Sequence, residues 1–193
     1  MIKNLFEVPY YEAELAIDCM QIYDWVNEYT DANPSVNLSN RGGYHSPNLE
    51  GEFPKLGVLL GEFERHANKF ANSLQAKPLV LGNVWFNTNG YMNYNDYHTH
   101  ANCVFSGVWY LATPENCGNL VFYHPRRELL SYDWNHTSMN SYNPMNSYSF
   151  SFKPAVNRLV LFPSWLEHSV EPNLNPDKKR ISFSFNFITA QGN

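Results

Sequence analysis

The sequence predicts a mainly β protein, a jelly roll backed by two N-terminal helices, in a single domain over residues 1–193. Apolar residues recur at three- and four-residue steps over residues 10–29 and again over residues 55–76, as in helices that bury one face. The rest of the chain changes to short apolar or alternating stretches between turn residues, which indicates strands. Two helices and then about eight strands fit a helical part, residues 1–77, packed on a jelly-roll core, residues 78–190.

Two long loops interrupt this pattern. Residues 30–54 are rich in Pro, Gly, Asn and Ser, and residues 124–146 are polar and aromatic without periodicity. Loops of this length in compact domains are often functional, so we expect them to frame the entrance of a site. The strands are expected at residues 79–87, 91–100, 104–112, 119–123, 147–153, 158–162, 167–171 and 180–188.

The composition is that of a globular protein, with 44% hydrophobic and 16% charged residues. A net charge of −5 and only two short basic clusters disfavour a nucleic-acid partner, which needs clustered Lys and Arg. No apolar run approaches the roughly 18 residues of a membrane span. The three cysteines lack C-x-x-C spacing and fit reduced thiols. We therefore expect a cytoplasmic protein without a membrane or nucleic-acid partner.

Alternate side chains share one face of a strand, so Asp96, His98 and His100 should project the same way. Neighbours at i and i+2 lie roughly 7 Å apart, close enough for two side chains to bind one metal ion. Asp96 and His100 are about twice as far apart, which leaves two options: His98 with His100, or Asp96 with His98. A solvated strand face is the ordinary alternative.

His168 is a third candidate ligand. It lies near the start of a short predicted strand, after the apolar stretch 159–163. A lone histidine in this position is more often a core or surface residue. Together with the His-x-His pair it suggests a three-histidine metal site, because imidazole is a common metal ligand.

The last predicted strand has one apolar and one polar face. Ile181, Phe183, Phe185 and Phe187 alternate with Arg180, Ser182, Ser184 and Asn186. If helices cover the apolar face, the polar face points into the barrel. An arginine there needs an anionic partner, and a carboxylate held by Arg180 and Ser182 meets that need. Alternatively, Arg180 pairs with an internal acid or lies at an exposed strand start.

The order of these motifs resembles the Fe(II)/2-oxoglutarate-dependent oxygenases, and most closely a prolyl-hydroxylase-like branch found in marine bacteria and phages. The similarity covers roughly residues 80–188. The pieces that carry it are His98-Thr99-His100, residues 106–111, His124-Pro125-Arg126, residues 161–164, His168 and residues 180–186.

This resemblance implies a double-stranded β-helix that binds Fe(II) through a facial triad and 2-oxoglutarate beside it. With O₂ as co-substrate it would hydroxylate a protein side chain such as proline, or a small metabolite, and release succinate and CO₂. The metal ligands would be His98, His100 and His168, with Asp96 in reserve. The co-substrate would contact Arg180, Ser182, Tyr91 and Asn186, and the substrate Arg126 and Trp85. The protein would lie in the host cytoplasm if a phage encodes it.

One position departs from the family. Most of the superfamily has a carboxylate where this chain has His100, so three neutral imidazoles would leave the iron with one more net positive charge. A zinc-dependent enzyme is an alternative, because His-x-His with a distant third histidine also suits zinc with a bound hydroxide. A cupin is disfavoured, because the cupin motif has a Glu shortly after His-x-His and residues 101–105 contain none. A non-catalytic jelly-roll binding or virion protein is the alternative outside the enzymes.

Overall fold

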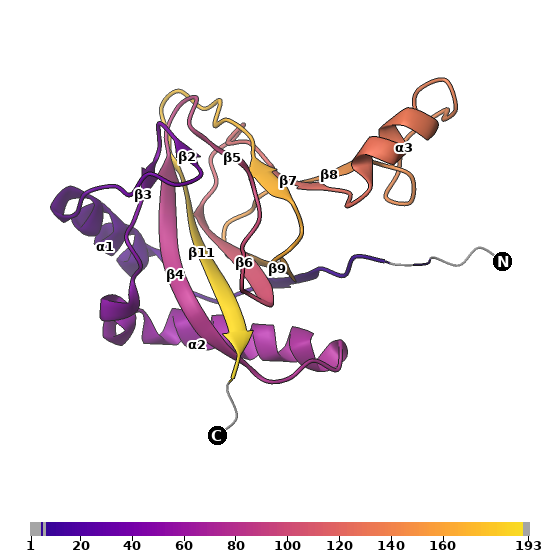
Figure 1. Cartoon of the computed structure of the whole chain (residues 1–193). Coiled ribbons are helices and arrows are strands. Elements are labelled where there is room, and N and C mark those ends of the chain that lie inside the picture. Colours follow the sequence, from indigo (N-terminus) through magenta and orange to yellow (C-terminus); the bar gives the residue numbers. More distant parts are fainter. Residues whose placement is uncertain (1–4, 6, 191–193) are drawn as a thin grey trace.

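Two antiparallel sheets face each other and form a jelly roll (Figure 1). The computed structural model describes residue 5 and residues 7–190. The six-stranded sheet has the order β1 (Tyr11–Glu14), β9 (Arg158–Pro163), β6 (Phe105–Ala112), β11 (Arg180–Thr189), β4 (Leu79–Asn89), β3 (Tyr44–His45). The five-stranded sheet has the order β2 (Asn40–Arg41), β5 (Tyr94–His98), β10 (His168–Val170), β7 (Leu120–Tyr123), β8 (Ser149–Phe152).

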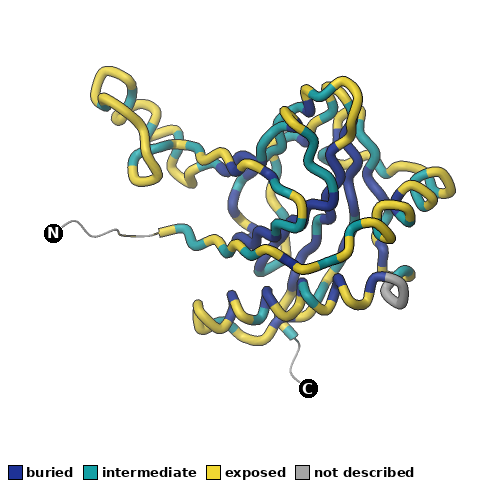
Figure 2. Tube along the Cα trace, turned by 180° about the vertical axis from the view of Figure 1, so that it is seen from behind, coloured by how far each residue is buried: buried dark blue, intermediate teal, exposed yellow. Residues whose placement is uncertain are grey.

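The two N-terminal helices lie on the outer face of the six-stranded sheet. α1 (Cys19–Ala32) begins after Asp18, whose carboxylate accepts a hydrogen bond from the Met20 N–H (3.0 Å), and a short 3₁₀ turn, η1 (Glu50–Glu52), precedes α2 (Phe53–Ser73). The apolar stripe of α2 and the apolar face of β11 are buried against each other. That layer contains, among others, Leu56, Leu59, Phe63, Ala67, Phe70, Phe183, Phe185 and Phe187. Figure 2 shows the burial concentrated on the central strands and on the sheet-facing side of α2.

A second, smaller apolar cluster fills part of the space between the two sheets. It includes Val108 and Tyr110 of β6, Phe122 of β7 and Phe162 of β9. The rest of the inner face of β11 is polar, because alternation turns Arg180 and its i+2 neighbours toward the second sheet. The barrel interior therefore has an apolar part and a polar part, and the candidate site lies in the polar part.

The structure corrects three of the predicted elements. The segment 11–14 is a strand rather than the start of a helix, because it pairs with Arg158–Leu161 along β9. The loop 30–54 contains the short strands β2 and β3, and the loop 124–146 contains the helix α3 (Arg127–Asp133). The other predicted strands are present with boundaries that differ by a few residues.

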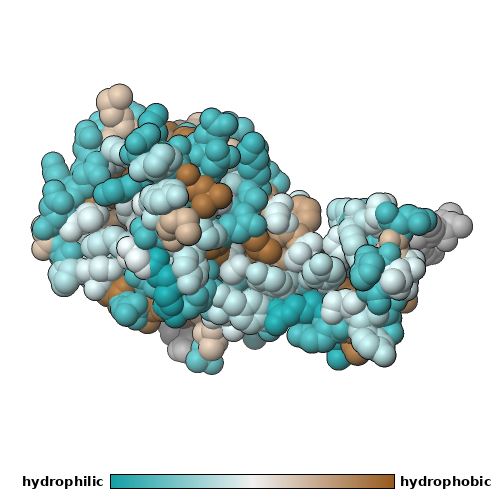
Figure 3. All heavy atoms as spheres, turned by 90° about the horizontal axis from the view of Figure 1, so that it is seen from above, coloured by the Kyte–Doolittle hydropathy of each residue, from teal (hydrophilic) through white to brown (hydrophobic). Residues whose placement is uncertain are grey.

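Residues 124–148 form an arm that projects from the barrel and carries α3 (Figures 1 and 3). Several large apolar side chains of the arm are exposed: Leu129, Tyr132, Trp134, Tyr142, Met145 and Tyr148. Among the residues described, no helix has the length and apolar character that a membrane crossing requires.

Candidate functional site

Three histidine side chains converge where β5 ends and β10 begins. His168 lies opposite His98 in the β5–β10 pair, and His100 follows just after β5. The His100 N–H donates a hydrogen bond to the carbonyl of Ser164 (3.0 Å). One ring nitrogen from each histidine lies within 4.8 Å of those of the other two, and the Nε2 atoms of His100 and His168 are 3.3 Å apart.

Backbone carbonyls orient two of the three rings. The Nδ1 atoms of His98 and His168 lie 2.6 Å and 2.8 Å from the carbonyl oxygens of Asp96 and Leu166. Because a carbonyl only accepts hydrogen bonds, each Nδ1 carries the proton and each Nε2 keeps a free lone pair. Both Nε2 atoms are thus available as metal ligands.

The imidazole cluster is uncharged at neutral pH. Burial lowers the pKa of His98, and burial with the neighbouring imidazoles lowers the pKa of His100 to about 4 and that of His168 to about 3. Within the described part of the chain, no carboxylate belongs to the cluster. Three neutral imidazoles with converging nitrogens fit a divalent transition metal, for which imidazole is a good ligand.

Asp96, predicted as an alternative metal ligand, interacts with residues outside the histidine cluster. Its carboxylate forms an ion pair with Arg41, while its main-chain carbonyl accepts the hydrogen bond from His98. A β-bulge between the pairs His168–His98 and Val170–Asn95 interrupts the regular alternation of β5, and Asn95 is buried where Asp96 is not. Asp96 therefore does not join the histidine cluster.

Arg180, at the start of β11, is buried with 2% of its surface exposed. Its Nη1 donates to the carbonyl of Cys117 (2.6 Å) and lies 3.3 Å and 3.4 Å from those of Glu171 and Gly118. Its Nε and Nη2 donors make no hydrogen bond with the residues that the structure describes. Burial disfavours the charged form of this guanidinium and so lowers its pKa. An anionic ligand on the unpaired Nε and Nη2 donors would offset the cost of the buried charge.

Gly118 allows the three carbonyls to gather around Arg180. Its φ is +81°, and a Cβ at this position would collide with the carbonyl oxygen of Glu171 and lie 2.7 Å from that of Pro172. Only glycine combines this left-handed backbone with such a close approach of two main-chain segments. These three carbonyls around the Arg180 Nη1 form a carbonyl cage, and the cage depends on glycine at position 118.

An inner cavity, of about 40 Å³, connects Arg180 with the histidines. Ser182 faces it, and register places Ser182 between Tyr110 on β6 and Asn87 on β4. Burial raises the pKa of Tyr110, so its hydroxyl stays protonated and able to donate. The Asn87 Oδ1 atom is buried without a hydrogen-bond partner among the described residues. Polar groups thus extend from Arg180 toward the histidine cluster.

An outer cavity, of about 720 Å³, opens on the other side of the histidines. Its walls come from the segment 36–48, from β4 and from the end of β5, and it shares Ser39, Trp85, His98 and His100 with the inner cavity. Its charged pair, Arg41 and Asp96, is mutually neutralised. The histidine cluster therefore lies between a small charged cavity and a larger uncharged one.

This geometry agrees with the comparisons to known proteins. A family model for 2OG-Fe(II) oxygenases matches residues 83–186, more than half of the chain, and that range contains all three histidines and Arg180. The chain belongs to the 2OG-Fe(II) oxygenase family. No curated protein sequence matches it.

Solved structures of other 2OG oxygenases share the fold of this family member. They include a prolyl-4-hydroxylase from Pseudomonas putida, with 16% identity, a TM-score of 0.64, and coverage of 95% of this chain and 94% of that chain. HygX from Streptomyces hygroscopicus, with nickel and 2-oxoglutarate bound, has 11% identity and a TM-score of 0.65 over 95% and 84% of the two chains. The α-ketoglutarate-dependent carbocyclase SnoK from nogalamycin biosynthesis has 11% identity and a TM-score of 0.68 over 95% and 81%. The predicted jelly roll is confirmed.

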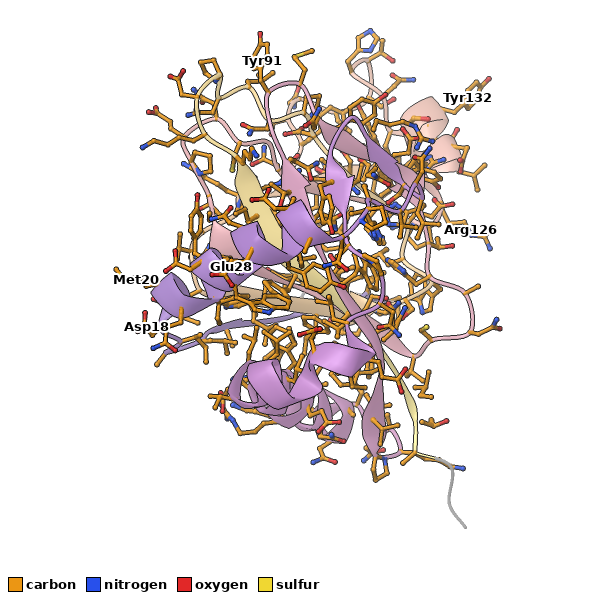
Figure 4. The ribbon with its side chains drawn as sticks, turned by 90° about the vertical axis from the view of Figure 1, so that its left-hand side faces the viewer. Asp18, Met20, Glu28, Tyr91, Arg126 and Tyr132 are labelled. Atoms are coloured by element: carbon orange, nitrogen blue, oxygen red, sulfur yellow. The ribbon has the colours of Figure 1, made fainter. Side chains whose placement is uncertain are left out.

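Two residues predicted to contact the co-substrate lie elsewhere in this oxygenase. Tyr91 is 57% exposed at the turn between β4 and β5 and points away from the barrel at one end of the molecule (Figure 4). Asn186 lines the outer cavity, and its side chain is already paired with Ser106 (2.7 Å) and Asn83 (2.9 Å). Tyr110 replaces Tyr91 as the candidate tyrosine.

Of the two residues predicted to meet substrate, one is well placed. Trp85 lines both cavities, whereas Arg126 is exposed on the periphery (Figure 4). The next residue, Arg127, turns toward the barrel instead. It donates to the Tyr97 hydroxyl (2.6 Å) and to Glu167 (2.9 Å), and so fixes the base of the arm beside the outer cavity.

Sequence reasoning missed Tyr110, Asn87 and His45 as site residues. Tyr110 lies in the apolar run of β6 and Asn87 in the mixed pattern of β4, so neither has a local signal. His45 comes from the long loop predicted to frame the entrance, and it is buried against Trp85 with the two rings stacked at 5.5 Å. The signal that could have identified His45 was a histidine with no assigned role in a loop predicted to frame the site.

Proposed function

We propose that this oxygenase is a hydroxylase that holds Fe(II) with His98, His100 and His168 and binds 2-oxoglutarate with Arg180 and Ser182. The observation that carries the proposal is the buried Arg180, which has unpaired donors and lines the same cavity as the histidine cluster. A guanidinium fork matches a carboxylate in bidentate geometry, so the far carboxylate of the keto acid is the natural ligand.

Each group in the inner cavity has a distinct task. The carbonyls of Asp96 and Leu166 fix the tautomers of His98 and His168, which keeps both Nε2 lone pairs available. Arg180 and Ser182 hold the carboxylate, with Tyr110 as a further donor. Val108, Leu120, Phe162 and Val170 line the same cavity and exclude water from it. Because that cavity is small, the rest of the co-substrate extends toward the metal and the outer cavity.

The bound Fe(II) centre, with 2-oxoglutarate and O₂, supplies the oxidation of a substrate C–H bond to C–OH. One oxygen atom enters the product and the other enters succinate, with CO₂ as the remaining product. The outer cavity lies directly beside His98 and His100 and is large enough for a side chain or a small molecule. A protein side chain such as proline is our first candidate, supported by the likeness to a prolyl-4-hydroxylase, and a small metabolite is the second.

The zinc alternative accounts for the histidines but not for Arg180. A zinc-bound hydroxide needs three histidines and a water, and gives no task to a buried guanidinium with unpaired donors. A non-catalytic jelly roll explains neither feature. Family membership and the Arg180 environment together favour the oxygenase over both.

The experiment is a turnover assay on protein stripped of metal and reloaded with Fe(II). We expect slow succinate formation with O₂ even without prime substrate, dependent on both Fe(II) and 2-oxoglutarate and lost in His168→Ala. A screen of peptides and metabolites for faster succinate release then identifies the substrate. Tight zinc binding with no effect of 2-oxoglutarate on turnover or stability would contradict the proposal.

A further inference from the structure

His100 is held differently from the other two histidines. Its main chain is fixed by Ser164, but no described residue makes a hydrogen bond with its Nδ1, whereas His98 and His168 each have a carbonyl partner. A metal-binding histidine almost always has such a partner for its second nitrogen. The His100 Nε2 is directed at the cluster, 3.3 Å from the Nε2 of His168, so a metal bound there leaves packing to hold the orientation of the ring.

The packing partner of His100 outside the cluster is Trp85. The two ring centroids are 5.7 Å apart with an interplanar angle of 42°, and His45 stacks on the same indole at 5.5 Å and 9°. His45, Trp85 and His100 thus form a ladder of three rings from β3 through β4 to the cluster. We propose that Trp85 and His45 are positioning residues that set the orientation of His100. The inference rests on the metal site proposed above.

The outer end of the ladder is itself rigid. The His45 Nδ1 lies 2.7 Å from the carbonyl of Ser46, which fixes the imidazole plane. The Ser46 N–H donates to the carbonyl of Phe86 (2.9 Å), and the Phe86 N–H donates to the Ser46 hydroxyl (3.0 Å). The strand that carries His45 is therefore fastened to the strand that carries Trp85. The Trp85 indole, which lies between His45 and His100, therefore has little freedom to rotate.

The ladder links the substrate side of the molecule to the metal side. His45 and Trp85 line the outer cavity, so the wall that would contact a prime substrate also sets the orientation of the His100 ring. The aromatic ring of His100 can be oriented by stacking, and the Trp85 indole is in place to do so. Removing the stack should weaken metal binding although neither His45 nor Trp85 is a ligand.

The test is the affinity of the metal-free full chain for Co(II), measured by calorimetry together with the visible Co(II) spectrum. We expect Trp85→Ala and His45→Ala to weaken binding by about 10- to 100-fold, the usual effect of losing a group that orients a metal ligand. Trp85→Phe and His45→Phe retain an aromatic face and should recover most of that loss. The Co(II) absorption of the two alanine variants should also differ from that of the wild type, because the geometry of the third ligand is altered.

Two further variants separate the outcomes. Asn48→Ala removes the side chain that accepts from the Val84 N–H (3.2 Å) on the same wall but outside the ladder, and should leave Co(II) affinity unchanged. His168→Ala sets the level for a lost ligand. Unchanged affinity in both alanine variants would overturn the inference alone, as would an equal loss in Asn48→Ala. Absence of Co(II) binding by the wild type would overturn the proposed function with it.

Discussion

His98 and His168 face each other across the β5–β10 pair, with ring centroids 4.3 Å apart. Antiparallel register alone brings together two residues that are far apart in the chain, and His100 joins them just beyond the end of β5. A slip of one residue between these strands would turn one ring out of the cluster. The site is thus encoded in strand pairing as much as in the choice of histidine.

The pH dependence of stability follows from the burial of these imidazoles. The pKa of His100 is lowered to about 4, below the roughly 6.5 of an exposed imidazole. Between these pH values the unfolded chain binds a proton that the folded, metal-free chain does not, so the free energy of unfolding falls as the pH is lowered. At about 1.4 kcal/mol per pKa unit, His100 should cost on the order of 3 kcal/mol across this window.

Urea denaturation of chelator-treated protein at several pH values measures this loss. His100→Gln should flatten the curve, whereas His136→Gln, at an exposed position on the arm, should not. The same slope in His100→Gln and wild type would show that His100 is charged in the folded protein.

Gly118→Ala should disturb the carbonyl cage around Arg180. The substitution places a Cβ against the carbonyls of Glu171 and Pro172 at a left-handed φ, and we expect it to lower the free energy of unfolding by about 1–3 kcal/mol. It should also weaken 2-oxoglutarate binding, because Nη1 loses its fixed acceptors. Gly61→Ala, where a Cβ would meet nothing, is the control and should be neutral or stabilising. Equal stability and 2-oxoglutarate affinity in Gly118→Ala and wild type would contradict the role of the cage.

Arg180→Lys tests the fork rather than the charge. A lysine ammonium keeps the charge but cannot bind a carboxylate in bidentate fashion, so 2-oxoglutarate affinity should fall at least about tenfold, or 1.4 kcal/mol. Calorimetry on metal-loaded protein measures this, with metal affinity as an internal check that should not change. Ser184→Ala, four residues further along the same face of β11, provides the matched control. Wild-type affinity in Arg180→Lys would mean that the co-substrate carboxylate lies elsewhere.

Arg127→Ala should loosen the arm without unfolding the barrel. The guanidinium donates to Tyr97 and Glu167 and lies 4.5 Å from the centre of the Tyr97 ring, but the site is partly exposed, so the loss of stability should be small. We expect faster hydrogen exchange and proteolysis within residues 124–148. Arg126→Ala is the neighbouring control and should behave like the wild type. An arm that is equally protected in both variants would show that other contacts hold it.

Much of the fold could be predicted because periodicity reports burial. The alternation from Arg180 to Phe187 predicted one face against the helices and one face inside the barrel, and the structure has both. The strand β1 escaped because its four residues are an edge strand stabilised by pairing with β9 rather than by a long pattern. Local sequence does not contain that distant partner.

The site was predictable only as far as local motifs reach. His98, His100, His168 and Arg180 stand in short recognisable motifs, and the structure brings them to one cavity. Tyr110 was missed because β6 is a central strand with both faces buried, so its inward tyrosine is surrounded by apolar letters. The sequence places Tyr91 on a predicted strand near the site, but this residue lies in a turn with Met92 at positive φ, which leaves it outside.

The most direct measurement is the visible spectrum of the anaerobic protein during titration with Fe(II) and 2-oxoglutarate. A keto acid chelated to ferrous iron gives a weak metal-to-ligand charge-transfer band, which reports metal and co-substrate at the same atom. We predict this band in the wild type, its loss in His168→Ala, and a need for at least about tenfold more 2-oxoglutarate in Arg180→Lys. A wild-type protein that binds Fe(II) and 2-oxoglutarate without the band, or a band that survives in His168→Ala, would contradict the account.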